Sequence, residues 1–331
     1  MSNSLIQFFA TAAKGLEPLV AEELRALGAR DVKESRGGAS FAGTRADAYR
    51  ACLWLRTANR VLLPITRFPS PDADALYTGV KCLPWEEDLT PDGSLAVDFT
   101  GTSPAITNTQ FGAQKVKDAI VDRFRERSGR RPSVDRMRPD VLINVHLHRE
   151  LATVSIDLSG DSLHMRGYRK ESVAAPLKEN LAAALLLKCG WPRIAGQGGS
   201  FVDPLCGSGT LVIEAALMAG DVAPGLTRDY WGFAGWLKHD HKLWERLVMD
   251  ARDRQHAARA KGPTIIGYDG DPRAILAAQQ NARIAGIAPA VRFEMKALEQ
   301  NTLPAGLPPG LVVTNPLRGT FGYGRTARPP V

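Results

Sequence analysis

The feature that most constrains the fold is the stretch at residues 201–210, with the sequence FVDPLCGSGT. Apolar residues open it, and two glycines, Gly207 and Gly209, separate them from a second apolar run at 210–218. Glycine permits backbone angles and close approaches that a side chain would block, and the first turn of a helix offers free N–H groups. We predict a strand that leads through a glycine turn into a helix, where a ligand can lie against bare main chain. Taken alone, a turn of this kind is more often structural than functional.

Strands and helices alternate around this stretch through the C-terminal half of the chain. Apolar segments too short to show period-two alternation lie at 264–268, 291–293 and 311–314. Asp271 and Pro272 are the expected N-cap and first-turn proline of a helix after the first of these segments. This alternation favours a parallel sheet covered on both faces.

The N-terminal half has a different pattern. The spacing of apolar residues predicts helices at 16–27 and 45–63, with a strand pair at 32–41 between them. Farther on, period-two alternation at 141–148 and 152–158 predicts an antiparallel hairpin with one buried face. The chain therefore combines an α+β part with an α/β part.

The 331 residues are enough for more than one hydrophobic core. We place domain boundaries so that residues 1–60, 61–160 and 161–331 form three parts, with a largely helical insertion at 220–262 in the last.

Composition excludes several classes of protein. The longest apolar run, at 181–187, is far shorter than the roughly 20 residues of a membrane span, and Lys14 and Glu17 argue against a secretory signal. The four cysteines lack the spacing of a zinc site or a disulfide framework, so we expect a reducing, cytoplasmic location. The net charge of +7 favours polyanionic partners without naming one.

Two further elements follow predicted strands. Asp269 ends the second parallel strand, where a carboxylate can accept both hydroxyl hydrogens of a ribose. The structural alternative, a helix cap, is already supplied by Asp271. Asn315 and Pro316 follow the fourth strand directly. An Asn-Pro pair is usually only a turn, but its place at the end of a parallel strand makes it a candidate site.

In this order, the pieces resemble a class I methyltransferase that uses S-adenosylmethionine, of the amine-methylating group with Asn-Pro-Pro-Tyr after strand four. The segments HMRGYR at 164–169, APLKENLA at 175–182, DPLCGSGT at 203–210 and APGL at 223–226 are similar to the RlmL-type guanine-N2 methyltransferases of large-subunit ribosomal RNA. The resemblance implies a ferredoxin-like part and a THUMP RNA-binding domain ahead of an incomplete Rossmann-like methyltransferase domain with a parallel sheet.

The resemblance also implies roles for individual residues. Asn315 would offer its carboxamide oxygen, and Pro316 its carbonyl, to the exocyclic amine of the target base. Methyl transfer of this kind needs no metal. The cofactor S-adenosylmethionine would be held by nine residues: Asp203, Cys206, Gly207, Ser208, Gly209, Thr210, Lys178, Glu179 and Asp269.

The sequence departs from the family after Pro316. Leu317 and Arg318 replace the expected Pro-Tyr, so the aromatic residue that would stack on the base is missing. The family's catalytic sheet has later strands, whereas residues 317–331 carry no strand pattern and read like a shifted frame or a truncation. We expect a fragment whose sheet ends early and leaves an edge prone to association.

Arginines far outnumber acids in residues 123–138, which begin in the last turn of a helix predicted at 108–127. Arginine matches phosphate geometry and stacks on bases, although a solvated surface explains the composition equally well. The THUMP resemblance favours RNA. The candidate RNA-binding residues are Lys115, Lys117, Arg123, Arg127, Arg130, Arg131, Arg166, Arg169 and Lys170.

Other aromatic and histidine residues have simpler explanations. Trp231, Phe233 and Trp236 could stack on bases, but clustered aromatic residues more often form a core, which is what we expect here. His146 and His148 lack a third ligand and are interpreted as surface residues.

Three functions compete at this point. The first is an RNA methyltransferase acting on ribosomal RNA of the large subunit before full assembly, with no membrane partner. The second is a non-catalytic RNA-binding protein or inactive truncated enzyme, and the third is a nicotinamide dehydrogenase. The Rossmann fingerprint places its acid about 20 residues after the glycines, and Asp269 comes much later. The residues alone do not separate guanine N2 from adenine N6, since both are aryl amines.

Overall fold

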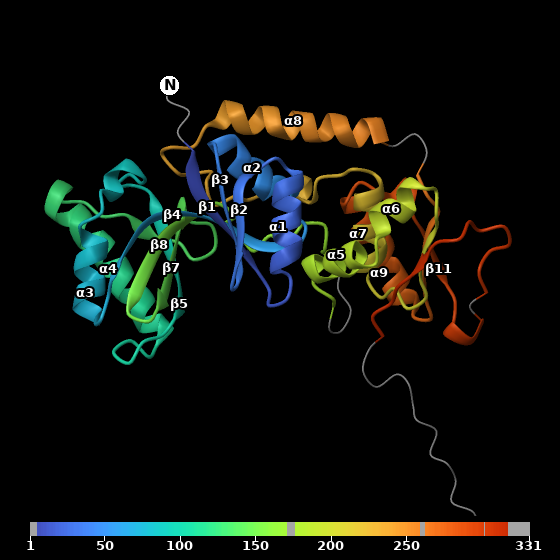
Figure 1. Cartoon of the computed structure of the whole chain (residues 1–331), viewed down its shortest axis with the longest axis horizontal. Coiled ribbons are helices and arrows are strands. Elements are labelled where there is room, and N and C mark those ends of the chain that lie inside the picture. The colour runs from blue at the N-terminus through green and yellow to red at the C-terminus, as the bar shows by residue number, and fades with distance from the viewer. Residues whose placement is uncertain (1–4, 171–175, 259–261, 301, 317–331) are drawn as a thin grey trace, which may run out of the picture. The chain divides into compact units, whose positions relative to one another are not determined.

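The computed structural model describes residues 5–170, 176–258, 262–300 and 302–316. The chain forms two compact units (Figure 1). The first comprises Met1–Gly167 and Val222–Ala257, and the second comprises Tyr168–Asp221 and Ala258–Val331. The departures expected at Leu317 and Arg318, and the tail after them, lie outside the described residues.

The first unit is built on one eight-stranded sheet with the strand order β2-β3-β1-β4-β8-β7-β5-β6. Its strands are β1 (Ile6–Ala12), β2 (Arg30–Ser35), β3 (Gly38–Gly43), β4 (Ala58–Pro69), β5 (Ser94–Gly101), β6 (Ser133–Val134), β7 (Val141–His148) and β8 (Leu151–Asp157). The long strand β4 pairs with β1 on one side and with β8 on the other. The segments before and after residue 60 therefore share a continuous sheet.

Four helices pack on this sheet: α1 (Glu17–Ala26), α2 (Arg45–Trp54), α3 (Ala73–Lys81) and α4 (Thr109–Ser128). Alternate strand residues such as Phe8, Val61 and Ile143 are buried in the same hydrophobic core as Val20 of α1 and Ile120 of α4. The period-two pattern thus puts one face of the sheet against the helices. The other face has mainly polar side chains.

Most of the predicted elements of this unit are confirmed. β7 and β8 form the expected antiparallel hairpin, and α4 begins at its N-cap Asn108 and ends at Gly129, whose φ is 68°. The helix predicted at 45–63 is wrong beyond Trp54. Residues from Ala58 onward form β4, because pairing with two neighbouring strands outweighs their local helical spacing.

The segment Val222–Ala257 interrupts the second unit in sequence but belongs to the first in space. It contains a short 3-10 helix, η2 (Pro224–Thr227), and most of α8 (His241–Ala258). Trp231, Phe233 and Trp236 are buried, and the rings of Phe233 and Tyr49 have centroids 4.5 Å apart. The interpretation of these aromatic residues as core is confirmed.

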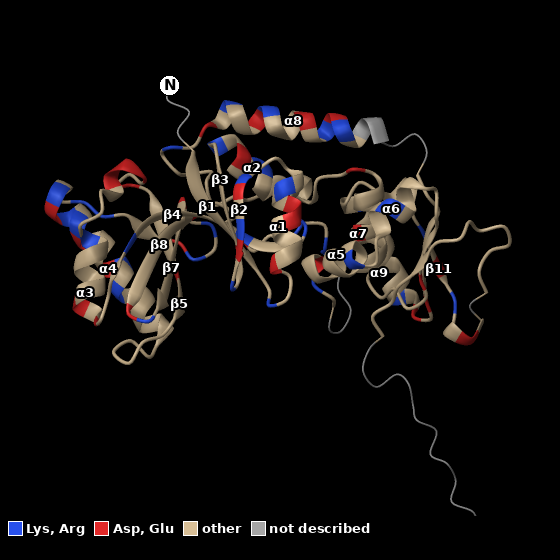
Figure 2. Ribbon diagram, in the orientation of Figure 1, with Lys and Arg blue, Asp and Glu red and all other residues tan. Residues whose placement is uncertain are grey.

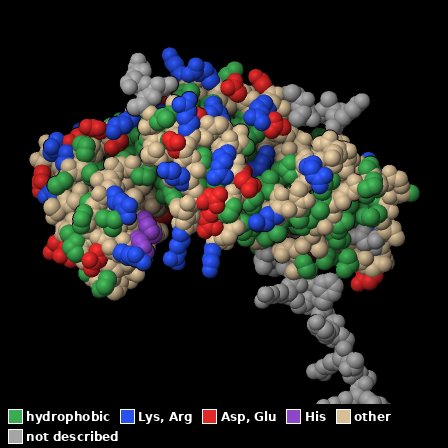
Figure 3. Space-filling model, in the orientation of Figure 1, with side chains coloured by type: hydrophobic (Ala, Val, Ile, Leu, Met, Phe, Trp, Pro, Cys, Tyr) green, Lys and Arg blue, Asp and Glu red, His purple; other side chains and the backbone are tan. Residues whose placement is uncertain are grey.

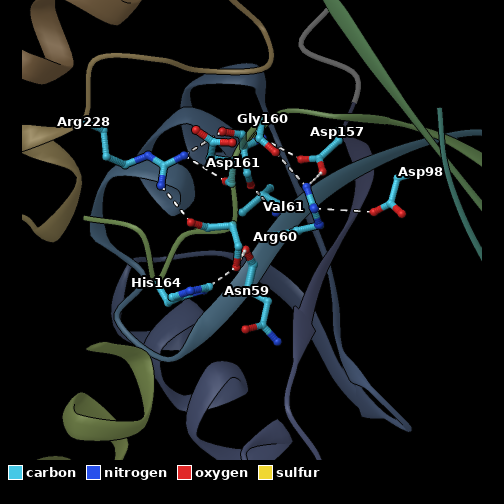
Figure 4. A network of polar contacts seen from close by, with 11 residues as sticks. Asn59, Arg60, Val61, Asp98, Asp157, Gly160, Asp161, His164 and Arg228 are labelled. Carbon is cyan, nitrogen blue, oxygen red and sulfur yellow. Dashed lines mark hydrogen bonds and ion pairs between the residues drawn. The ribbon is translucent and has the colours of Figure 1, made fainter. Parts of the chain in front are cut away.

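Arg228 fixes the start of this segment. Its guanidinium donates to the carbonyls of Ser159, Asp161, Ser162 and Met165, as Figure 4 shows for several of these bonds. One arginine therefore satisfies the main chain that follows β8.

The second unit has a four-stranded sheet with the order β11-β10-β9-β12. Its strands are β9 (Phe201–Asp203), β10 (Ile265–Asp269), β11 (Arg292–Met295) and β12 (Leu311–Val312). All three neighbouring pairs are parallel, which confirms the predicted α/β organisation. The helices are α5 (Glu179–Lys188), α6 (Trp191–Gly196), α7 (Thr210–Ala219) and α9 (Pro272–Ile284), with short 3-10 helices at Ala288–Ala290 and Leu298–Gln300.

The strand order reverses between β9 and β12, the first and last strands of this sheet along the chain. In open α/β sheets, ligands bind beyond the carboxyl ends of the strands at such a reversal. We therefore expect a ligand site at the residues that follow β9, β10 and β12. Among the helices of the described ranges, none has the length and apolar character needed to span a lipid bilayer.

Candidate active site

The glycine turn after β9 has the predicted strand-turn-helix form. Gly207 and Gly209 have φ angles of 53° and 85°, in the region that favours glycine. A Cβ atom at Gly209 would lie 2.9 Å from Cβ of Ala278 on α9. Gly209 is also the N-cap of α7. Glycine is therefore required at position 209, where the main chain passes close to α9 and α7 begins.

Asp269 holds this turn from the neighbouring strand. Its Oδ2 accepts the N–H of Gly207 at 2.9 Å, and its Oδ1 accepts the N–H of Asp271, also at 2.9 Å. Asp271 itself caps α9 by accepting from the N–H of Arg273. The two aspartates thus have separate roles, and Asp269 presents a half-buried carboxylate at the carboxyl end of β10 beside the glycine turn.

Asp203 and Cys206 are both buried at the end of β9. Burial raises the pKa of Asp203 to about 7, and the charge of Asp269 acts in the same direction. The N–H of Leu205, which donates to Asp203 at 3.1 Å, acts against this rise. Burial also raises the pKa of the Cys206 thiol well above its ordinary value, so Cys206 is not a thiolate nucleophile at neutral pH.

Glu179 lies at the start of α5, where it is buried and forms an ion pair with Arg169 at 2.9 Å. The same arginine donates to the carbonyl of Leu177 and to the hydroxyl of Thr210. Arg169 therefore ties the segment before α5 to the first residue of α7. Lys178, next to Glu179, is exposed.

Asn281 was missed by the sequence analysis. It is buried on α9, and its side-chain amide donates to the carbonyl of Ser208 in the glycine turn at 3.2 Å. Its Oδ1 accepts the N–H of Lys170. The signal in the sequence is a single asparagine on a helix face that otherwise buries alanines such as Ala278 and Ala282.

Asn315 and Pro316 are exposed just beyond β12. β12 lies beside β9, with Leu311 opposite Phe201 and the N–H of Val313 donating to Val202. The paired ends of β9 and β12 therefore bring Asn315 to the same edge of the sheet as Asp203. The strand ends at Val312, two residues earlier than predicted.

The predicted RNA-binding residues are spread over both units. Arg166 is 1% exposed and donates to the carbonyls of Leu163 and Arg56, so it is in the interior. Several basic residues on and after α4 are paired with acids: Lys115 with Asp74, Lys117 with Asp118, Arg123 and Arg127 with Glu86, and Arg130 with Asp92. Arg131 and Lys170 are exposed.

Comparison with known proteins gives consistent matches along the chain. The RlmL ferredoxin-like domain matches residues 7–62, the THUMP domain matches residues 70–157, and the RMKL-like methyltransferase domain matches residues 166–320.

Two curated relatives have the name ribosomal RNA large subunit methyltransferase K/L. The protein of Syntrophotalea carbinolica is 57% identical over 316 residues, which are 95% of this chain and 44% of the relative. The protein of Methylococcus capsulatus is 54% identical over 312 residues, which are 94% of this chain and 42% of the relative. The chain spans less than half the length of these relatives.

Two solved structures match nearly the whole chain. SMU.472, complexed with SAH, is 32% identical with a TM-score of 0.81, and the match covers 97% of this chain and 82% of that one. A predicted N6-adenine-specific DNA methylase from Listeria monocytogenes is 34% identical with a TM-score of 0.81, covering 95% and 80%. With these matches, the chain belongs to the RMKL-like methyltransferase family, and in this chain a ferredoxin-like and a THUMP domain precede the methyltransferase domain.

Proposed function

We propose that the chain is the part of an S-adenosylmethionine-dependent enzyme that methylates the N2 amine of a guanine in large-subunit ribosomal RNA. The observation that carries the proposal is Asp269, whose carboxylate is held against the glycine turn at the strand-order reversal. The relatives named as ribosomal RNA methyltransferases, and the bound SAH of SMU.472, support it.

The residues at this edge fit a nucleoside cofactor with a sulfonium group. Asp269 suits the ribose hydroxyls, because a carboxylate accepts hydrogen bonds from both. The turn from Asp203 to Gly209 suits the methionine end of the cofactor. Its two glycines leave the main chain uncovered by side chains, and the free N–H groups at the start of α7 follow directly. When bound, the cofactor supplies an electrophilic methyl group.

Asn315 and Pro316 suit the second substrate. The lone pair of an aryl amine is delocalised into its ring, so the amine is a weak nucleophile. Oxygen acceptors at the N–H hydrogens draw the amine out of that conjugation and take up the positive charge that develops on it. The carboxamide oxygen of Asn315 and the carbonyl of Pro316 would provide these acceptors, and the rest of catalysis would be positioning of the amine in line with the methyl group.

The choice of guanine follows from the resemblance to guanine-N2 methyltransferases, since the same acceptors serve adenine N6. One structural neighbour is named as an adenine-specific DNA methylase, but the more similar relatives are named for ribosomal RNA. We accordingly propose RNA before full assembly of the large subunit as the partner and the cytoplasm as the location.

Mapping of methylated nucleotides tests the proposed function. Deleting the gene that contains this sequence should remove N2-methylguanosine at one position of large-subunit ribosomal RNA, measured by mass spectrometry of RNA fragments. The wild-type gene should restore the mark, and the variant Asn315→Ala should restore less than about 1% of it, because the amine loses an acceptor in the transition state.

A matched control is Gln280→Ala, which removes an exposed carboxamide on α9. It should restore the mark fully. Unchanged guanine methylation in the deletion strain would contradict the proposal and favour a non-catalytic RNA-binding protein. If the deletion strain instead lost an N6-methyladenine, the substrate base would be adenine and not guanine.

A further inference from the structure

The face of the eight-stranded sheet that points away from the helices contains a groove of about 630 Å³. Figure 3 shows basic and histidine side chains together at the edge of this unit. The groove crosses strands from both halves of the sheet, and six of its lining residues carry the argument: Phe9 on β1, Arg36 on the β2–β3 turn, Arg60 and Arg67 on β4, and Asn144 and His146 on β7.

The strand register explains why these residues share one face. Phe9 lies opposite Leu62, and Ser155 of β8 lies opposite both Pro64 and Asn144. Their immediate chain neighbours, such as Phe8, point into the core. Because β1 and β7 are three strand spacings apart, the groove spans roughly 14 Å across the sheet.

The charge of the groove is positive at two places. Arg36 and Arg67 are exposed, and within the described ranges neither has a carboxylate close enough for an ion pair. Arg60 between them is different, because it pairs with Asp157 and, at 3.5 Å, with Asp98 (Figure 4). Arg60 is therefore shared between two carboxylates of the protein, and Arg36 and Arg67 remain available to an anionic partner.

The arginines Arg123 and Arg127 on α4 are not available to phosphate in the same way, because they already form ion pairs. Arg123 donates two hydrogen bonds to Glu86, at 2.8 and 2.7 Å, and Arg127 donates a third at 2.6 Å. In Figure 2 the ribbon on and around this helix carries acidic as well as basic residues. An RNA phosphate would have to displace these carboxylates, whereas no carboxylate of the described residues forms an ion pair with Arg36 or Arg67.

The groove also has surfaces for bases. A Cβ atom at Gly38 would lie 2.9 Å from the ring of Phe9, so the ring lies across the neighbouring strand and its outer side is half-exposed. On the other side of the groove, the rings of His146 and His148 are nearly parallel, with centroids 6.3 Å apart. Aromatic rings on an open sheet stack with unpaired bases, and polar side chains beside them bond base edges. Bases inside a duplex are not accessible to such contacts.

We propose that this groove binds a single-stranded segment of RNA, with backbone phosphates at Arg36 and Arg67 and bases between Phe9 and His146. The proposal deepens the proposed function, on which it rests for the choice of RNA, by assigning RNA contact to the sheet face and not to α4. An acidic protein segment would meet the two arginines but would not use the aromatic surfaces.

Fluorescence anisotropy of the whole chain with a labelled 12-nucleotide single-stranded RNA tests this assignment. The double variant Arg36→Gln/Arg67→Gln should weaken binding by about tenfold, and the slope of log affinity against log salt should fall by roughly 1.4, since two phosphate contacts are lost. Phe9→Leu should weaken binding by about fivefold at an unchanged slope. The matched control Arg127→Gln removes the same charge from α4 and should change affinity by less than about twofold.

Several results would overturn the inference. These are a larger loss from Arg127→Gln than from the double variant, equal affinity for the annealed duplex, or equal competition by polyglutamate at matched charge. Titration of SAH into the same proteins separates the two claims. Uptake of SAH with RNA binding insensitive to Arg36 and Arg67 refutes the groove alone, whereas groove-dependent RNA binding without SAH uptake refutes only the proposed enzyme.

Discussion

The substitution Arg169→Met is expected to lower the free energy of unfolding of the second unit by about 3–5 kcal/mol at pH 8, because it leaves a buried carboxylate without its partner. The side chains of Arg169 and Glu179 are 16% and 5% exposed, so solvent screens their interaction only weakly. The substitution also removes the hydrogen bonds to Leu177 and Thr210.

The measurement should report on the second unit alone. Trp191 is its single tryptophan, and the indole N–H donates to the carbonyl of Ala215 on α7. Urea unfolding followed by the fluorine NMR signal of 5-fluorotryptophan at this position therefore isolates its transition. Arg273→Met, which breaks an exposed ion pair with Asp271, should cost less than about 1 kcal/mol. Two results would contradict this role of the ion pair. One is a loss of unfolding free energy in Arg169→Met no larger than in Arg273→Met. The other is a double variant, Arg169→Met/Glu179→Leu, that is no more stable than Arg169→Met.

Asp203→Asn, in contrast to Arg169→Met, is expected to raise the free energy of unfolding relative to wild type as the pH approaches 7. The pKa of Asp203 is raised to about 7 in the folded chain, mainly by burial, against about 3.9 when unfolded. Between these two values the folded chain retains a proton that the unfolded chain has lost, so wild-type stability falls as pH rises from 4 to 7. Asparagine has no such proton. Relative to wild type, the variant should therefore gain on the order of 3 kcal/mol across this window.

The same Trp191 signal, followed in urea at pH 4, 5, 6 and 7, measures this difference. Asp271→Asn serves as the control. Arg273 lowers the pKa of Asp271, so the pH dependence that this group contributes lies below about pH 4, and the difference between this variant and wild type should change little from pH 4 to 7. A difference between Asp203→Asn and wild type that does not change with pH would show that Asp203 is already ionised in the folded chain.

The parts of the candidate site that could be predicted are those fixed by local sequence. The glycine turn, the cap at Asp271 and the positions of Asp269 and Asn315 all follow from where short apolar strands end. In a parallel sheet the strand ends share one edge, so their relative placement needs no long-range information. The roles proposed for these residues toward cofactor and base stay predictions.

Pairings between distant segments could not be predicted from the sequence. Arg169 was assigned to RNA and Glu179 to the cofactor, yet the two side chains bind each other. Arg123 and Arg127 on α4 look free in sequence because their partner Glu86 comes from a separate 3-10 helix, Trp85–Glu87. β4 was missed for the same reason, since its strand conformation depends on pairing with β8, far along the chain.

Isothermal titration of SAH into the purified chain tests the central claim most directly. The wild type should bind one SAH, Asp269→Asn should weaken binding by about 100-fold because it loses charge-assisted bonds to the ribose, and Asp271→Asn should bind within about twofold of wild type. Saturable binding that disappears only with Asp269 would place the nucleoside at the glycine turn. No heat from the wild type, or equal affinity in Asp269→Asn, would contradict the account.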